Sequence, residues 1–366
     1  MKLTVTAQIK LLPDESQIEL LKQTKTSYLE ACNYVSESAF NNNMFKNSQL
    51  HDDCYYDLRA KFSLPSQMAC SVTKYVVSKY KSIKANKYKL TLVNFKKPMY
   101  ELVFNRDYSF LKDVLSLNTL KGRIKVVYIT KGKEHYFDGT WSFGTAIIKQ
   151  KHGKWIMSIP VTKEVADVNS FSNTVGIDLG VNFLATVYDG KKTTFYNGRG
   201  IKQKRANYSK TRKELQQKQT PSARHKLKTI GSRENRWMND VNHCITKALC
   251  TKYDNTLFVL EDLTGIRNAT EKVKLKNRYV TVSWAFYDFR QKLTYKSILY
   301  GSSTITVDPK YTSRKCPICY HIEKSNRNKK THTFKCKHCG YQTNDDRIGA
   351  MNLYNMGIEY QRIVTI

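Results

Sequence analysis

Four cysteines in the last sixth of the chain constrain its fold more than any other feature. They form two Cys-x2-Cys pairs, Cys316 with Cys319 and Cys336 with Cys339, and sixteen residues separate the pairs. This spacing is typical of a ribbon in which four thiolates hold one structural Zn²⁺ ion. The metal supplies folding free energy that a short polar segment cannot obtain from a core. A redox role for either pair is the alternative, which the paired spacing disfavours.

The charge balance points to a polyanionic partner. The 366 residues include 62 Lys and Arg against 30 Asp and Glu, which gives a net charge of +32. Such a surplus repels itself unless a polyanion neutralises it, and nucleic acid is the expected one. A membrane surface is the competing partner, but the chain has no apolar run long enough to span a bilayer and no signal-peptide core, so we expect no membrane partner.

The hydrophobic pattern predicts two regions of different architecture. The first is a β-rich module interrupted by a helical insert of about 70 residues, and the second, from Thr174 on, alternates strands and helices. In the first region we expect strands at 3–12, 89–95, 101–104, 124–129, 145–149 and 155–161, and helices from Glu15 to about 39 and over 52–85. In the second we expect strands in NTVGID, FLATVY and TTFYN and at 257–260 and 304–307, helices over 198–228, 232–250 and 283–300, and a last helix from about Asp345.

Three acidic positions stand out in a chain that is poor in acids. Asp178 ends the apolar stretch of VGIDLG, Glu261 ends LFVLE, and the pair Asp345–Asp346 opens the last helix. Taken singly, Asp178 is as typical of a turn or a cap as of a catalytic site, whereas Glu261 and the Asp345–Asp346 pair are more typical of such structural roles. Together they predict three carboxylates at one edge of an α/β sheet, whose mutual repulsion two Mg²⁺ ions would relieve.

Four stretches of the sequence together resemble the TnpB family of transposon-encoded RNA-guided DNA endonucleases, which are relatives of the type V CRISPR effectors. They are VGIDLGVNFLATV, VLEDLTGI, WAFYDFRQKLTYK and the block PKYTSRKCPIC…FKCKHCGYQTNDDRIGAMNL, and the resemblance is closest over residues 173–355. It implies an RNase H-like, RuvC-type α/β nuclease domain that is split in sequence, with the zinc ribbon inserted before its last segment.

The resemblance also implies a domain plan, for the N-terminal half by architecture only. We expect a multidomain α+β protein whose β-barrel-like wedge domain carries a helical insertion. The expected segments are 1–14 and 86–165 for the wedge, 15–85 for the helical recognition domain, 166–173 for a linker, 174–310 and 342–366 for the nuclease domain, and 311–341 for the zinc ribbon.

The resemblance assigns the catalytic acids of the family to three positions of this chain. Asp178 and Glu261 match the first and second acids of the family, and Asp346 matches the third because Asn352 follows it by six residues, as in the family motif. The chain departs from the family at Ile348 and Gly349, where Asn and Ala are usual. It departs again at Tyr320, where Gly is usual. Neither departure removes a ligand.

The partners implied are a guide RNA from the protein's own locus and target double-stranded DNA, bound by a monomer in the prokaryotic cytosol. Residues 202–228 are strongly basic, so we expect them to line the channel for nucleic acid. The candidate contacts are Lys202, Lys204, Arg205, Lys210, Arg212, Lys213, Arg224, Lys226 and Lys228.

Several alternatives remain open at this point. Within the class, the chain could be a compact type V CRISPR effector or a regulator that binds DNA through a guide without cutting it. Outside the class, the chain could be a transposase that performs strand transfer with an RNase H-like fold. GIDLG also opens the sugar-kinase and actin-like ATPase fold, but the cysteine pairs and the charge fit that fold poorly.

Overall fold

A computed structural model describes residues 1–97, 99–151, 153–180, 182–263 and 286–364. The chain divides into two compact units, an N-terminal unit of Lys2–Glu164 and a C-terminal unit of Val165–Ile366 together with Met1. No helix within these ranges combines the length and the apolar character that a membrane span needs. The first three residues of the helix predicted over 283–300 lie outside the described residues.

The N-terminal unit is built on an antiparallel sheet in the order β2-β7-β8-β1-β5-β4-β3, with β6 also paired to β8. Its longest ladder joins β1 and β8, from Lys2 opposite Glu164 to Leu11 opposite Trp155. One isolated bridge, Phe104 to Tyr108, links the residues after β2 to β3 at the two ends of the order. The strands are β1 (Lys2–Leu12), β2 (Tyr100–Leu102), β3 (Tyr108–Phe110), β4 (Val114–Thr119), β5 (Gly122–Ile129), β6 (Ser142–Phe143), β7 (Ala146–Lys151) and β8 (Lys154–Glu164).

Three helices, α1 (Glu15–Asn41), α2 (Asn47–Lys61) and α3 (Ser66–Ala85), are inserted between β1 and β2, where the pattern predicted a helical insert. The single helix predicted over 52–85 is two helices in the structure, α2 and α3, and α2 begins five residues earlier than predicted. Asp14 begins α1 with a capping box, in which its carboxylate accepts from the Gln17 backbone and the Gln17 side chain accepts from the Asp14 backbone. Such a box satisfies two of the backbone donors that a helix start leaves unpaired.

The strand predicted at 89–95 is wrong, because this segment bonds to helix side chains instead of to a neighbouring strand. Asn33 of α1 holds both backbone groups of Phe95, donating to its carbonyl at 3.1 Å and accepting from its N–H at 2.7 Å. Ser36 donates to the carbonyl of Val93, whose N–H donates to the hydroxyl of Tyr80. These partners lie far away in sequence, so local alternation could not reveal them.

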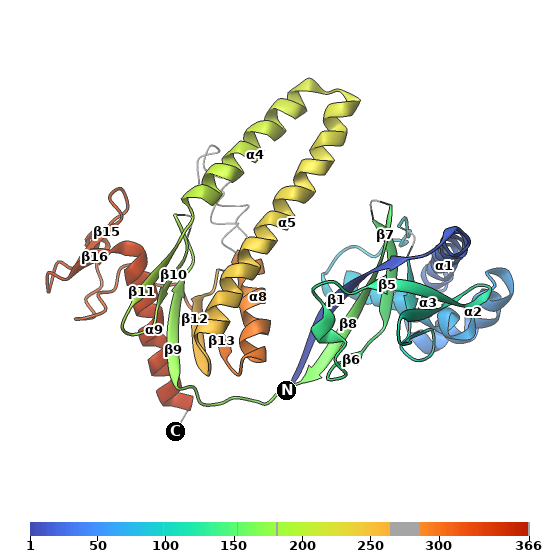
Figure 1. Cartoon of the computed structure of the whole chain (residues 1–366), viewed down its shortest axis with the longest axis horizontal. Helices are drawn as coiled ribbons and strands as arrows, with labels where there is room; N and C mark the ends of the chain where they lie inside the picture. Colours follow the sequence, from blue (N-terminus) through green and yellow to red (C-terminus); the bar gives the residue numbers. More distant parts are fainter. Residues whose placement is uncertain (98, 152, 181, 264–285, 365–366) are drawn as a thin grey trace. The chain divides into compact units, whose positions relative to one another are not determined.

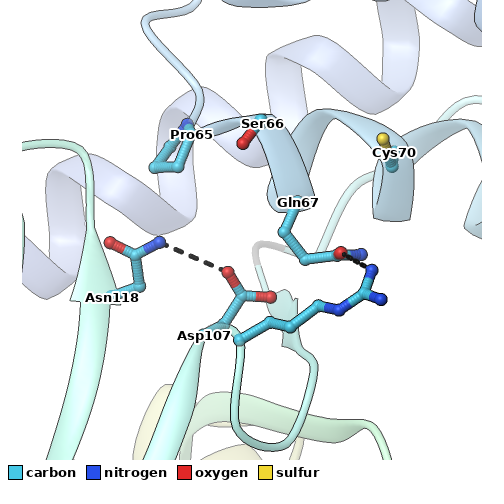
Figure 2. A pocket seen from close by; sticks show the side chains of 7 residues that line it. Pro65, Ser66, Gln67, Cys70, Asp107 and Asn118 are labelled. Atoms are coloured by element: carbon cyan, nitrogen blue, oxygen red, sulfur yellow. Dashed lines mark hydrogen bonds between the residues drawn. The ribbon is translucent and has the colours of Figure 1, made fainter.

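A pocket of about 430 Å³ lies where the start of α3 meets the loops around β3 and β4 (Figure 2). At its base the buried Asp107 accepts from the Val103 N–H at 2.9 Å and from Asn118 at 3.3 Å. Arg106 beside it donates to Gln67 of α3 at 2.8 Å. The Arg106–Gln67 bond therefore joins the helical insert to the sheet, whereas Asp107 ties together segments of the sheet module.

The C-terminal unit contains a five-stranded mixed sheet in the order β11-β10-β9-β12-β13. Strands β9, β10 and β11 form the predicted antiparallel meander, whereas β12 runs parallel to both β9 and β13. The strands are β9 (Asn173–Asp178), β10 (Phe183–Tyr188), β11 (Thr193–Asn197), β12 (Thr256–Glu261) and β13 (Ser303–Val307).

Helices cover both faces of this sheet (Figure 1). Side chains of α5 (Pro221–Lys252) and α8 (Phe286–Leu299) bury Val175, Ile177, Phe258 and Leu260 on one face. On the other face α9 (Asp345–Val364) packs on β9, β10 and β12, and its Leu353 contacts Leu257 and Val259. Because side chains alternate along a strand, the residues between those of the first core face α9.

Helices α4 (Arg199–Lys218) and α5 form a long antiparallel hairpin that extends beyond the sheet (Figure 1). The sequence predicted helix on both sides, and the break falls at Gln219, which has a left-handed backbone with φ of 51°. Thr220 then caps α5 and Pro221 occupies its first turn. Leu215, Ala223 and Ile230 form a small core within the hairpin.

The ribbon lies between β13 and α9. Its three short strands, β14 (Arg327–Asn328), β15 (Thr333–Lys335) and β16 (Gln342–Asn344), pair in that order, and β16 continues directly into α9. The position of the ribbon's last strand therefore fixes where α9 begins.

Gly176 permits an unusually close approach between β9 and α9. A Cβ built on Gly176 would lie 2.1 Å from the carbonyl oxygen of Ala350 and 2.5 Å from the backbone nitrogen of Tyr354. Both atoms belong to the backbone of α9 and cannot rotate away. The strand and the helix can therefore take up this spacing only with glycine at position 176.

We expect Gly176→Ala to destabilise the C-terminal unit by about 1–3 kcal/mol, the usual cost of overpacking a core. The measurement is denaturant-induced unfolding followed by circular dichroism. Gly231→Ala in α5 is the matched control, because a Cβ there meets nothing within 4 Å. The control should be neutral or gain about 0.5–1 kcal/mol from helix propensity. Equal stability of the two variants would contradict the close approach.

Candidate active site

Asp178 and Glu261 occupy equivalent positions on neighbouring parallel strands. β9 and β12 pair in the register Ile177 to Leu260, and the two acids are the next residue on each strand. Both strands end there, and both acids point to the face that α9 covers, since Ile177 and Leu260 point to the opposite face. Sequence position alone predicted the strand ends, and the register now places the two carboxylates side by side.

The third acidic position comes from the first turn of α9. Asn344 caps this helix, with its side-chain oxygen accepting from the N–H groups of Asp346 at 3.0 Å and Arg347 at 3.2 Å. The cap fixes the direction of the helix start, and with it the two aspartates that follow.

The electrostatics show that the acids share one environment. Burial, followed by the charges of Glu261 and Asp346, raises the pKa of Asp178 well above its ordinary value. Burial also raises the pKa of Glu261, and burial together with the neighbouring Asp345 raises that of Asp346. These carboxylates therefore repel one another in a half-buried site, which is the donor set that a hard divalent cation stabilises.

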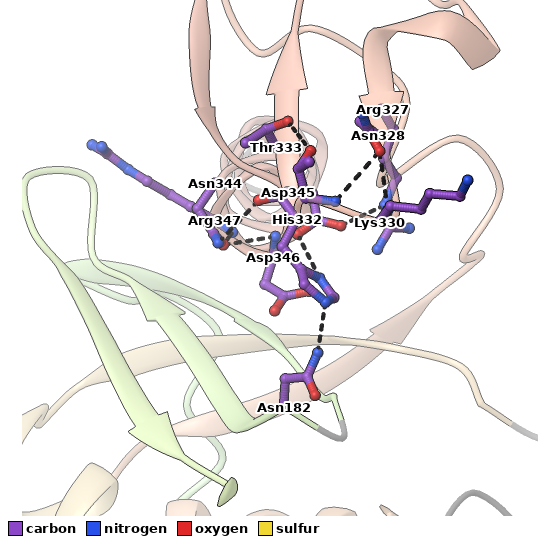
Figure 3. A network of polar contacts seen from close by, with 11 residues as sticks. Asn182, Arg327, Asn328, Lys330, His332, Thr333, Asn344, Asp345, Asp346 and Arg347 are labelled. Carbon is purple, nitrogen blue, oxygen red and sulfur yellow. Dashed lines mark hydrogen bonds and ion pairs between the residues drawn. The ribbon is translucent and has the colours of Figure 1, made fainter. Parts of the chain in front are cut away.

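Asp345 and Asp346 have different surroundings (Figure 3). The Asp345 side chain is fully buried, and one of its oxygens accepts from Arg327 Nε at 2.8 Å. His332 Nδ1 lies 3.5 Å from its other oxygen. Asp345 therefore ties α9 to the ribbon, whereas Asp346 remains half-buried beside Asp178.

Among the residues that the structure describes, two groups of potential metal ligands have all their ligand atoms within 4.8 Å of one another. One consists of the four cysteines, and the other of His332, Asp345 and Asp346. Asp178 and Glu261 belong to neither group. The assignment of Asp178, Glu261 and Asp346 as one metal site therefore remains a prediction, which their shared environment supports.

Thr312 holds the carboxylate of Glu261, and Asn352 holds Thr312. The Thr312 hydroxyl donates to Glu261 Oε1, and this bond lowers the pKa of Glu261 in part. Asn352, on α9, donates to the carbonyls of Thr312 at 2.6 Å and Lys315 at 2.8 Å. The residue six positions after Asp346 is thus linked to the second acid through the segment that precedes the first cysteine pair.

Gly349 brings Asp178 against α9. A Cβ at this position would lie 2.8 Å from Asp178 Oδ2 and 2.9 Å from its Cγ. Gly349, Ala350 and Leu353 follow Asp346 by three, four and seven residues, so they share its helix face, and all three are buried on the sheet side of α9. The small size of Gly349 and Ala350 makes room for Asp178 and for the β9 backbone.

The four cysteines lie together as their spacing predicted. Sγ of Cys316 is 3.6 Å from that of Cys339, and Sγ of Cys319 is 3.5 Å from that of Cys336. A tetrahedral site with Zn–S bonds of about 2.3 Å has sulfurs about 3.8 Å apart, so the four thiols fit a zinc ion. Burial raises the pKa of Cys336, but the backbone N–H groups of Cys339 and His338 and the nearby thiols lower it to about 6 overall.

Both cysteine pairs form the same tight turn, which ends in a left-handed residue. The N–H of Tyr320 donates to the Cys316 carbonyl at 3.0 Å, and the N–H of Gly340 donates to the Cys336 carbonyl at 3.1 Å. Tyr320 has φ of 61° and Gly340 has φ of 75°. Glycine adopts this conformation without strain, whereas an L side chain costs about 1–2 kcal/mol.

We expect Tyr320→Gly to stabilise the ribbon by about 1 kcal/mol, because it removes this backbone strain. The Tyr320 ring is exposed, and the substitution removes its contact with Lys315, whose Nζ lies 4.8 Å from the ring centroid. Zinc transfer to a colorimetric chelator, measured against chelator concentration, reports the change. Gly340→Ala is the reverse control and should release zinc more readily. If Tyr320→Gly retained zinc less well than the unaltered protein, the backbone at Tyr320 would not be strained.

The basic segment divides into exposed and buried cations. Arg205 is buried and pairs with Glu234 of α5, and Arg212 also pairs with Glu234. The prediction that Arg205 contacts nucleic acid is therefore corrected, since Arg205 joins α4 to α5 inside the hairpin. The candidates that remain exposed are Lys202, Lys204, Lys210, Lys213, Arg224, Lys226 and Lys228.

Sequence reasoning missed the residues that hold the acids. Thr312, Arg327 and His332 carry no local signal for this role, because each acts on an acid at least 13 positions away in sequence. Position 312 lies within the PKYTSRKCPIC block that carried the resemblance, which is the one signal that marked it.

The C-terminal unit is thus a mixed sheet covered by helices on both faces, with acids at its strand ends and a cysteine ribbon before the last helix. Among solved structures, CasPhi-2 (Cas12j) bound to crRNA and phosphorothioate-DNA shares this fold at a TM-score of 0.52 and 9% identity, with 97% of this chain and 91% of that one covered.

Family models match two segments, the Cas12f1-like TNB domain over residues 286–353 and a probable transposase over 158–271. TnpB-like protein MJ0751 of Methanocaldococcus jannaschii is 30% identical over 62% of this chain and 82% of its own length. The chain belongs to the TnpB family.

Two other relatives are longer than the region they share with this chain. The putative RNA-guided DNA endonuclease InsQ of Escherichia coli is 30% identical over 57% of this chain and 56% of its own length. Cas12f1 of Syntrophomonas palmitatica is 27% identical over 57% of this chain and 44% of its own length. The chain thus spans about half the length of these two relatives.

Proposed function

We propose that this protein is an RNA-guided DNA endonuclease of a transposon, which hydrolyses DNA phosphodiesters at Asp178, Glu261 and Asp346. The observation that carries the proposal is the pair of carboxylates on adjacent parallel strands, facing the helix start that bears the third. The names of the relatives support the same activity.

The three acids would hold two Mg²⁺ ions. Their raised pKa values show that negative charge is unfavourable in this site until a cation offsets it. When bound, two such ions stabilise the attacking and leaving oxygens of an in-line displacement at phosphorus.

The residues around the acids orient them. Thr312 fixes one oxygen of Glu261, which leaves the other for a ligand role. Arg327 and His332 engage Asp345, so that Asp346 is the member of the pair left to face Asp178. Orientation of this kind reduces the entropy lost when the reacting groups come together.

The remaining parts of the molecule would bind the partners. The seven exposed cations of the α4–α5 hairpin suit a phosphate backbone, which is bound through charge and shape while base pairing reads the sequence. We assign guide-RNA binding to the N-terminal unit, one structural Zn²⁺ to the four cysteines, and a monomeric protein to the ribonucleoprotein.

Substitution within the aspartate pair tests the catalytic assignment. Asp346→Ala should lower cutting of guide-matched DNA by about a thousandfold or more, as loss of a central catalytic group does, and leave target binding intact. Asp345→Asn should instead lower the unfolding temperature and retain measurable cutting, because it weakens a buried pair with Arg327. Cleavage is measured on purified ribonucleoprotein with labelled plasmid, and binding by gel shift.

Loss of cutting only in Asp345→Asn would reverse the assignment within the pair. Guide-directed binding by the unaltered protein without any cutting would instead identify a regulator. Sequencing the RNA that co-purifies from cells carrying the native locus tests the guide itself, and we expect an abundant RNA from that locus. The genes beside that locus distinguish a transposon from a CRISPR array.

Magnesium should stabilise the C-terminal unit more at pH 8 than at pH 5.5. Asp178 and Glu261 have raised pKa values, so their contribution to stability is present while they are protonated and is lost as the pH rises through those values. Mg²⁺ binds the deprotonated acids. At pH 8, and well above its dissociation constant, it should raise the unfolding temperature by about 2–5 °C.

Calorimetry with and without MgCl₂ at the two pH values gives this difference directly. Asp178→Asn should abolish the magnesium effect at pH 8. Stabilisation of equal size at both pH values, or stabilisation that survives Asp178→Asn, would place the magnesium elsewhere.

A further inference from the structure

A pocket of about 400 Å³ adjoins the start of α9, between the β9–β10 turn, the end of β11, the start of α4 and the ribbon. Two of its lining residues contact the acid pair. Asn344 caps α9 through the N–H of Asp346, and His332 has a ring nitrogen within 4.8 Å of a carboxylate oxygen of Asp346. Figure 3 shows Asn182, His332 and Asn344 around Asp346. A ligand in this pocket would therefore lie next to the proposed metal site.

The pocket combines an aromatic ring with three amide side chains. Phe183 lines it, and the ring of Phe183 lies 4.8 Å from that of Phe195, which is 40% exposed. The amides are Asn182, Asn197 and Asn344, which come from three separate elements. Asn182 is also held to His332 by a 3.0 Å hydrogen bond between Nδ2 and Nε2. An aromatic face beside amide donors and acceptors is the chemistry that binds an unstacked nucleobase.

The rim of the pocket is cationic. Arg199 and Lys202, both exposed in the first turn of α4, line it, and none of the described lining residues is acidic. The backbone N–H of Arg199 donates to Asn197 Oδ1 at 2.8 Å, which holds the end of β11 and the start of α4 together. Cations beside a base-sized pocket suit the phosphate that accompanies each base. The volume falls within the range of small-ligand pockets, roughly 300–1,000 Å³.

We propose that this pocket, the base pocket, holds one unpaired base of the DNA strand that is cut, from a nucleotide next to the scissile phosphate. The proposal rests on the nuclease function above and adds a means of placing the strand. A base within a duplex is stacked and paired, so only an unpaired strand could enter the base pocket. The active site would thereby select unwound DNA.

The test uses single-stranded DNA in which 2-aminopurine replaces one base at a time along the strand. The protein is the full chain with its co-purified RNA and Glu261→Gln, which leaves the base pocket unaltered and prevents cutting. We expect fluorescence quenching at one position. Phe183→Leu should remove this quenching and weaken strand binding about tenfold, within the range for loss of one base–aromatic stack.

An abasic site at that position should weaken binding to the same extent, and should cause no further loss in Phe183→Leu. Phe183→Tyr keeps the ring and should behave as the unaltered protein. Tyr360→Leu is the matched control, because Tyr360 is 42% exposed on the same helix as Asp346 but about 21 Å along its axis. The control should change neither quenching nor affinity.

The base pocket would be overturned if Phe183→Leu lowered quenching equally at every strand position. It would also be overturned if the abasic site and Phe183→Leu weakened strand binding additively. The same coupling seen with RNA but not DNA oligonucleotides would overturn the DNA assignment. If the protein without Glu261→Gln cuts guide-matched DNA but Phe183→Leu changes quenching at no strand position, the base-pocket proposal is wrong and the nuclease function stands. If it does not cut and the effect of Phe183→Leu at one strand position persists, the nuclease function is lost, the placement beside a scissile phosphate falls with it, and the pocket remains only as a binding site for an unpaired base.

Discussion

The close approach of α9 to strand β9 is the constraint on which the rest of the C-terminal unit depends. The backbone of α9 at Ala350 and Tyr354 leaves no room for a side chain at position 176. Only at this spacing can the first turn of α9 reach the ends of β9 and β12, where Asp178 and Glu261 lie. Gly349 extends the same contact to the Asp178 carboxylate. Backbone packing thus sets how far the acids lie from one another.

The ribbon and the acids form one connected structure. β16 runs into α9, Asp345 of α9 binds Arg327 of β14, and Asn352 binds the segment before the first cysteine pair. Thr312 in that segment donates to Glu261. Two of the three acidic positions are therefore held by residues whose placement depends on the ribbon. An insertion that looks separate in sequence contributes to the geometry of the site.

The sequence was informative where the signal is local and misleading where partners are remote. Cysteine spacing and strand-end acids predicted the ribbon and the acidic edge, because both follow from short-range chemistry. The strand predicted at 89–95 failed because Asn33, Ser36 and Tyr80 bind its backbone from helices. The sequence predicted that Arg205 contacts phosphate, but Arg205 is buried in the α4–α5 hairpin and pairs with Glu234, which lies 29 positions away. No periodicity encodes such pairs.

The direct junction between β16 and α9 has a consequence for how this protein would respond to its surroundings. Asp346 is only two residues beyond the end of β16, with no spacer to absorb movement. If the four cysteines hold zinc as proposed, a cell short of zinc would leave the start of α9, and the aspartates it carries, without a fixed position. The proposed activity would then follow trace-metal supply.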